Sequence, residues 1–285
     1  MDGLDTVSTA YQTPSERDAA TKSLTDYEFK SGLKVFADHC GFRRGELHTF
    51  IGTKGSGKST WSKTILGELG YSEKGVLLYI SEERKNKYLS SLNNSFALAK
   101  MPEETIKKYL ENIIVLGELD SKITNENVLF ETMEKLIIDC DLDVLIFDNF
   151  TTSFLSELPI NAQSRILRRF KELADKLDIP VILFFHTGKL KTTSTLDGDN
   201  VRGSGTAINI GSYNYIITQF KEGQNLRNFI FTEKSRYHSR ANKKMYEIIY
   251  DYRVGMFVKC ADYHMEDFQA LISGKFEKNQ EKGFR

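Results

Sequence analysis

The stretch GTKGSGKST, residues 52–60, decides the fold of this 285-residue chain. It matches the phosphate-loop pattern G-x-x-x-x-G-K-[ST] and lies between a strand predicted over 47–52 and a helix predicted from Lys58 to about Leu69. In such a loop, glycines let backbone N–H groups turn toward anionic oxygens, and the N-terminus of the helix adds partial positive charge. The sequence therefore predicts a site for a nucleoside triphosphate.

The residue types around the loop also suit a bound Mg²⁺ ion. We expect Lys58 to reach the outer phosphates, Ser59 to hold Mg²⁺ through its hydroxyl, and Thr60 to contact the inner phosphate. The site needs a second acid, and the predicted strand DVLIFD (143–148) ends in Asp148, which we expect on the Mg²⁺ side through a water. The residues expected to bind the nucleotide or its metal are Gly52, Gly55, Gly57, Lys58, Ser59, Thr60 and Asp148.

Two more predicted strands end in residues that suit hydrolysis. YISEE follows the phosphate-loop helix and places Glu82 and Glu83 at the end of a strand over 76–80. Neighbouring residues at a strand end face opposite ways, so at most one of them is expected to orient the attacking water. PVILFFH (180–186) ends in His186, which is either a polar residue at the sheet edge or a sensor of the γ-phosphate.

The overall pattern predicts an α/β fold. Apolar strands alternate with helices from residue 47 to 186, which is typical of a parallel sheet covered on both faces. Four alternating segments then follow, YNYIITQF, LRNFIFTEK, KKMYEIIYDY and GMFVKC, and they predict an antiparallel extension of the same sheet. We expect one domain over 28–272, a flexible arm over 1–27 and a charged tail over 273–285.

Composition excludes several classes of protein. The chain has no apolar run long enough for a membrane span and no secretory signal, so we expect a cytoplasmic protein without a membrane partner. Its cysteines, Cys40, Cys140 and Cys260, are scattered and predict reduced thiols rather than disulfides or a zinc site. Lys and Arg total 39, as do Asp and Glu, and this zero net charge argues against coating nucleic acid through bulk charge.

The motifs together resemble a known family. In chain order they are GFRRGEL, GTKGSGKS, YISEE, DVLIFDN, ILFFHTGK, VRGSGTAINIGSYNYIIT and TEKSRYH. Over roughly residues 31–260 this set resembles the RecA-like ATPases, and within them the DnaB-type hexameric helicases and the small RepA-type plasmid helicases. The resemblance implies a RecA-like phosphate-loop core, ATP and Mg²⁺ as cofactors, and a homo-oligomer, a hexameric ring with ATP sites between subunits.

The same resemblance implies roles for individual residues. It favours Glu83 over Glu82 as the glutamate that activates water, and it makes His186 the γ-phosphate sensor. Lys234 and Arg236, in EKSR, match the pair that reaches into the neighbouring subunit's site, with Arg236 as an arginine finger. Without the resemblance, these two cations would be interpreted as solvated charges at a strand end.

The resemblance also implies a nucleic-acid contact in the loop 187–203. Lys189, Lys191 and Arg202 would contact the phosphates of single-stranded DNA in a central channel. The loop has no aromatic residue, so its binding would be independent of sequence and strongly dependent on salt. The alternative is a solvated surface loop. Tyr263 is a further candidate, to stack on the adenine.

Three functions remain open from the sequence. The first, which the cations favour, is a motor that translocates on single-stranded DNA and unwinds duplex, as in plasmid or phage replication. The second is a recombinase that forms a filament. The third is a KaiC-like or RadA-like regulatory ATPase that uses ATP as a switch, and the zero net charge favours it.

Overall fold

The computed structural model describes residues 33–37, 41–71, 74–187, 209–222, 224–236 and 242–272. Its strands are β1 (Leu47–Thr53), β2 (Val76–Ile80), β3 (Ile113–Gly117), β4 (Val144–Asp148), β5 (Val181–Thr187), β6 (Tyr213–Glu222), β7 (Asn225–Ser235), β8 (Met245–Asp251) and β9 (Met256–Tyr263). They form one sheet in the order β3-β2-β4-β5-β1-β6-β7-β8-β9.

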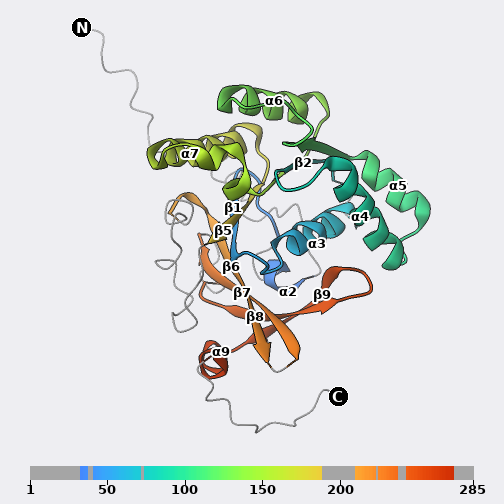
Figure 1. The fold of residues 1–285 in the computed structure, drawn as a ribbon, viewed down its shortest axis with the longest axis vertical. Coiled ribbons are helices and arrows are strands. Elements are labelled where there is room, and N and C mark those ends of the chain that lie inside the picture. Colours follow the sequence, from blue (N-terminus) through green and yellow to red (C-terminus); the bar gives the residue numbers. More distant parts are fainter. Residues whose placement is uncertain are drawn as a thin grey trace, which may run out of the picture.

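The helices are α2 (Lys34–Ala37), α3 (Lys58–Tyr71), α4 (Lys85–Leu98), α5 (Glu103–Glu111), α6 (Glu126–Asp139), α7 (Ile160–Leu177) and α9 (Met265–Ile272), with 3-10 turns η1 (Phe150–Thr152) and η2 (Phe154–Glu157). Helices α3, α4 and α5 cover one face of the parallel strands, and α6 and α7 cover the other (Figure 1). This arrangement confirms the predicted α/β class with a parallel core.

Both faces of the sheet are apolar because alternate side chains of each central strand point to opposite sides. In β4, Val144 and Ile146 pack in the cluster under α3 and α4, while Leu145 and Phe147 pack in the cluster under α6 and α7. All five residues of β2 and all five of β4 are buried. This double burial explains why these strands are continuous apolar runs in the sequence.

The antiparallel extension begins one strand later than predicted. β6 pairs with β1 in parallel, and the antiparallel pairings are those of β6 with β7, β7 with β8 and β8 with β9. The alternating pattern of 213–220 reports which side chains are buried and carries no information about strand direction, so the pattern could not distinguish the two pairings. The predicted antiparallel extension is confirmed for β7–β9.

β9 returns to the helix that follows the phosphate loop. The Phe257 backbone N–H donates to Thr64 Oγ1 of α3 at 3.0 Å, and the Phe257 ring packs against Trp61 with ring centroids 4.7 Å apart. These contacts bring the β8–β9 turn close to the phosphate loop, although about 200 residues separate the two in sequence.

The predicted arm (1–27) and tail (273–285) lie outside the described residues, so the domain limits stay predictions. Within the described ranges, no helix has both the length and the apolar character needed to cross a membrane. The same ranges contain no cluster of three or more His, Cys, Asp or Glu side chains arranged to hold a metal ion by themselves.

Candidate nucleotide site

The phosphate loop joins β1 to α3, and its glycines are required by its shape. Gly55 and Gly57 have φ angles of 81° and 90°, in the left-handed region that favours glycine. A Cβ on Gly52 would lie 2.4 Å from Ser56 Oγ and 2.9 Å from the Ile217 carbonyl oxygen, so this position also excludes a side chain. The backbone is therefore free to surround a ligand closely, as the sequence predicted.

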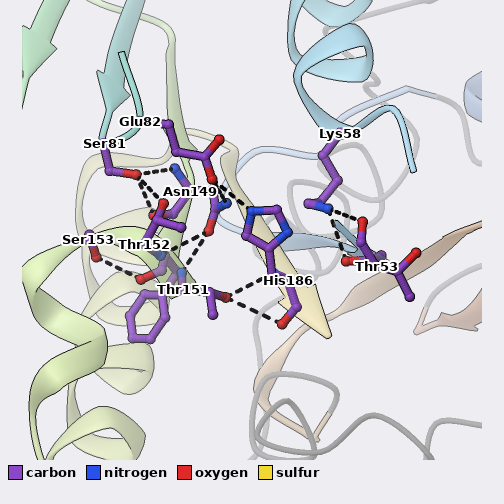
Figure 2. A network of polar contacts seen from close by, with 11 residues as sticks. Thr53, Lys58, Ser81, Glu82, Asn149, Thr151, Thr152, Ser153 and His186 are labelled. Atoms are coloured by element: carbon purple, nitrogen blue, oxygen red, sulfur yellow. Dashed lines mark hydrogen bonds and ion pairs between the residues drawn. The ribbon is translucent and has the colours of Figure 1, made fainter. Parts of the chain in front are cut away.

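Lys58 lies in the loop with its ammonium directed at loop carbonyls. Its Nζ donates to the Gly52 oxygen at 3.0 Å and to the Thr53 oxygen at 2.6 Å (Figure 2). Burial lowers the pKa of Lys58 to about 8, while the nearby carboxylates of Asp148 and Glu82 oppose this effect. An ammonium has three donors, so two hold the loop and one remains for a phosphate oxygen.

The first turn of α3 supplies the other hydroxyls. Ser59 is exposed and Thr60 is half-buried, so both remain accessible to a ligand at the loop. Ser56 is buried, and its Oγ has no hydrogen-bond partner among the described residues. An unpaired buried hydroxyl inside a glycine-rich loop, together with the space left by Gly52, fits a bound triphosphate.

Asp148 ends β4 opposite Ile80 of β2, and β5 separates β4 from the phosphate-loop strand. Burial raises the pKa of Asp148 to about 7, Glu82 adds to the rise, and hydrogen bonding from Ser62 and the charge of Lys58 oppose it. A nearby divalent cation would favour the charged carboxylate, so Asp148 fits the expected Mg²⁺ role.

Glu82, rather than Glu83, lies beside His186. Glu82 Oε1 is 2.7 Å from His186 Nε2 and 3.0 Å from Asn149 Nδ2 (Figure 2). The charge of Glu82 also acts on Lys58 and that of Glu83 on Lys63 of α3, and both glutamates act on Asp148. The resemblance favoured Glu83, whereas Glu82 is the glutamate that contacts His186 in the structure.

Asn149 connects the ends of three strands. Its Oδ1 accepts hydrogen bonds from the backbone N–H groups of Thr151 (2.8 Å) and Thr152 (3.3 Å), and its Nδ2 donates to Glu82. The His186 backbone N–H donates to Thr151 Oγ1 at 2.9 Å. Sequence reasoning missed Asn149, although Asn followed by Thr-Thr two residues later is a common helix-capping pattern.

Lys234 and Arg236 lie at the end of the strands opposite to the phosphate loop. Tyr213 pairs with His48, near the start of β1, and Ser235 pairs with Tyr213, so Arg236 lies beyond the start of β1. The phosphate loop begins at the other end of β1, roughly 15 Å away at about 3.3 Å per residue. The structure therefore does not bring the two cations to the phosphate loop of their own chain.

The two cations differ in their surroundings. Lys234 Nζ donates to the backbone oxygens of Asn209 (3.1 Å) and Gly211 (2.8 Å), and burial and then the charge of Arg236 lower the pKa of Lys234. The Arg236 side chain is exposed, and its backbone N–H donates to the Ser212 oxygen at 3.0 Å. The backbone of Arg236 is therefore held at the end of β7, while its side chain lies on the surface.

The remaining predicted contacts are placed differently or lie outside the structure. Lys189, Lys191 and Arg202 lie outside the described residues. Tyr263 ends β9, six residues after Phe257, whose ring lies against the phosphate loop. Its ring packs on Phe229 at 5.1 Å, beneath the Arg227 guanidinium. Tyr263 does not lie beside the phosphate loop of its own chain.

A groove lies close to the loop, between α4 and the β8–β9 turn. Its volume is about 420 Å³, and its lining includes Lys87, Asn94, Tyr252 and Arg253 but no carboxylate. The Tyr252 side chain is 77% exposed. The turn precedes Phe257, whose ring would lie 3.2 Å from a Cβ on Gly57, but none of the residues that line the groove belongs to the phosphate loop.

Comparison with known proteins supports a phosphate-loop ATPase fold. The chain matches no family model. It is 24% identical over 204 residues to the uncharacterised ABC transporter ATP-binding protein YclH of Bacillus subtilis, covering 60% of this chain and 88% of that protein. Its structure resembles that of a KaiC-like protein from Pyrococcus horikoshii, with a TM-score of 0.61 and 17% identity over 82% of this chain and 98% of that one.

Neither likeness shows the DnaB-type helicase that the sequence motifs resemble. The glycine-lined loop, Lys58 and the order of the strands agree with both likenesses. The chain therefore shares with the KaiC-like protein an α/β fold with a mainly parallel central sheet.

Proposed function

We propose that the chain is a Mg²⁺-dependent ATPase of KaiC-like type that uses ATP binding and hydrolysis as a switch. The observation that carries this proposal is the meeting of Glu82 and His186, 2.7 Å apart, at the sheet edge that also holds Lys58 and Asp148. A base beside a buried lysine and a glycine-rich anion site is the set that phosphoryl transfer to water requires.

Each of these residues has a separate task in the proposed site. The loop N–H groups and Lys58 bind the phosphates, while Ser59 and Asp148 hold Mg²⁺, directly or through water. Bound Mg²⁺ would neutralise charge that develops on the phosphate oxygens. Burial of Lys58 and Asp148 keeps water away from these charges, which strengthens their action on the ligand.

Glu82 is the proposed base. Oε1 is held by His186 and Asn149, which leaves Oε2 to orient the attacking water. His186 would sense the γ-phosphate, because a change in its position alters its contact with Glu82. Glu83 remains the alternative base, and separate Glu→Gln variants at the two positions distinguish them.

The active form is proposed to be a homo-oligomer with sites between subunits. Support comes from the exposed Arg236 at the edge of the sheet opposite the phosphate loop, where it can reach only a site on another copy. In that position Arg236 would stabilise charge on the transferred phosphoryl group, assisted by Lys234. A hexameric ring is the proposed arrangement.

The groove beside α4 is the proposed subsite for the nucleobase. The turn that lines it leads to Phe257 beside the loop, and the groove offers the exposed ring of Tyr252 for stacking and the cation of Lys87, while Arg253 is paired with Asp251. These features fit the base and ribose of a nucleotide whose phosphates lie on the loop.

The ATPase rate, measured against protein concentration with and without single-stranded DNA, tests the proposed function. We expect Mg²⁺-dependent hydrolysis whose specific rate rises with concentration, is lost in Glu82→Gln and does not respond to DNA. Strong stimulation by single-stranded DNA would instead support the DNA motor, and with it the proposed contacts of Lys189, Lys191 and Arg202. Absence of hydrolysis at every concentration would contradict both.

A further inference from the structure

A buried carboxylate joins three segments at the end of the strands opposite to the phosphate loop. Glu46, directly before β1, is 6% exposed, and its Oε2 accepts a hydrogen bond from the Ser212 hydroxyl. The same oxygen accepts from Lys171 Nζ of α7 at 2.8 Å, and Lys171 also donates to the Gly45 backbone oxygen. A buried carboxylate is costly unless it is paired, so Lys171 compensates the charge of Glu46.

Ser212 extends this anchor to the end of β7. Its backbone N–H donates to the Leu47 oxygen at 2.9 Å, and its backbone oxygen accepts from the Arg236 N–H at 3.0 Å. Ser212 is fully buried, and the residue before it, Gly211, accepts from Lys234 Nζ at 2.8 Å. Both cations therefore make hydrogen bonds to the same short piece of backbone.

A bulge interrupts β7 shortly before its end. Glu233 has no partner on β6, because Asn214 and Tyr215 pair with the residues on either side of it. A bulge bends its strand and changes the direction of nearby side chains. The direction of the residues beyond the bulge is therefore set by the contacts that hold their backbone, and not by regular pairing alone.

We propose that Glu46 and Ser212 are positioning residues for Arg236: the buried carboxylate fixes Ser212, and Ser212 fixes the backbone from which the guanidinium extends toward a second copy. This inference rests on the proposed role of Arg236 between subunits. Glu46 and Ser212 are both buried, so they act only through Arg236. Displacement of a catalytic group by about 1 Å can cost about 100-fold in rate, so the anchoring of this strand end affects hydrolysis.

The chain provides a matched control for the pair of Glu46 with Lys171. Lys176, also on α7, donates to the Glu134 carboxylate of α6. Glu134→Ala thus removes the acidic partner of another α7 lysine. That pair joins two helices and is not part of the network around Ser212.

The test places each change on one side of the shared site at a time. Lys58→Ala supplies only Arg236, and Arg236→Ala supplies only an intact phosphate loop, so an equimolar mixture is active only where the two kinds of copy meet. Adding Ser212→Ala to the Lys58→Ala chain should lower the kcat of the mixture by about 3- to 10-fold, and adding Glu46→Ala by about 10-fold or more. The KM for ATP should stay the same, because the loop that binds the nucleotide belongs to the other copy.

The reverse placement separates positioning from a general loss of stability. Added to the Arg236→Ala chain, Ser212→Ala or Glu46→Ala should not change the rate of the mixture, because that chain has no arginine to position. Glu134→Ala should not change it in either chain, and thermal unfolding checks that each variant is folded.

Each other outcome has a distinct meaning. Equal losses in the two placements would overturn the proposal, as would an unchanged rate when Ser212→Ala and Glu46→Ala are on the chain that supplies Arg236. If the mixture of Lys58→Ala and Arg236→Ala is itself inactive, the proposed site between subunits is wrong, and the positioning role with it.

Discussion

The two ends of the central strands differ in how much of a catalytic site each carries. At the phosphate-loop edge, one chain brings together Lys58, Asp148, Glu82 and His186, with contacts as short as 2.7 Å. At the opposite end of the strands, backbone oxygens hold Lys234, while the Arg236 side chain is exposed and makes no ion pair with the residues that the structure describes. The difference suggests that a single copy can bind a nucleotide, but that hydrolysis needs the far edge of a second copy.

The largest effect is expected from removing the exposed cation. Arg236→Ala should lower the ATPase kcat by about 10³-fold, since arginine fingers contribute on this order, while nucleotide binding by the dilute chain stays unchanged. Lys107→Ala, which removes an exposed cation from α5, is the matched control and should behave as wild type. Equal activity in wild type and Arg236→Ala would remove the distinction between the two edges.

The next effect separates the two glutamates. Glu82→Gln should lower kcat by about 10²- to 10³-fold with nucleotide affinity retained, because the amide cannot accept a proton from water. Glu83→Gln should stay within a few-fold of wild type, since the contact with His186 is made by Glu82. Single-turnover hydrolysis measures both, and the reverse order of effects would identify Glu83 as the base.

The third effect concerns the free energy of unfolding, which reports the cost of burying the charged Asp148 carboxylate beside the phosphate loop. Asp148 has a folded-state pKa of about 7, above its ordinary value of 3.8, so its ionisation penalises the folded state fully above pH 7 and not at all below about pH 4. Asp148→Asn should therefore stabilise the protein by about 2 kcal/mol at pH 8, with a gain that shrinks toward pH 4.

The pKa of Asp148 already includes the favourable charge of Lys58, so the expected gain is the balance between the cost of burial and that attraction. Chemical denaturation in EDTA at several pH values measures the change. A variant that is less stable than wild type at pH 8 would show that Asp148 contributes to folding rather than to ligand binding.

The smallest effect concerns the groove. Tyr252→Ala should weaken nucleotide binding by about 10-fold if its ring stacks on the base, since such stacking contributes about 1–3 kcal/mol per base. Leu226→Ala, which truncates another exposed side chain far along the sheet, should leave affinity unchanged. Equal affinities for Tyr252→Ala and wild type would place the base elsewhere.

The parts of the site that the sequence predicted are those fixed by local pattern. The phosphate loop, the end of β4 at Asp148 and the end of β5 at His186 follow from apolar runs that stop at a polar residue. Asp148 could be identified without ambiguity, because it is the single acidic residue at the end of its strand. The parallel core and its helices were predicted for the same reason.

The parts that were missed depend on contacts between distant segments. Glu82 and Glu83 are adjacent, and the choice between them depends on where His186 and Asn149 lie after folding. The Glu46–Ser212 contact joins segments 166 residues apart, so neither segment predicts it alone. The parallel pairing of β6 with β1 likewise leaves no trace in the alternation of residues 213–220.

The most direct test of the shared site is to mix two inactive variants. Lys58→Ala disables the phosphate loop but keeps Arg236, and Arg236→Ala keeps an intact loop but lacks the exposed cation. If sites form between copies, an equimolar mixture contains interfaces that join an intact loop to an intact Arg236, and ATPase activity should reappear at about a quarter of the wild-type rate if the copies assort at random. A mixture no more active than either variant alone would contradict the account.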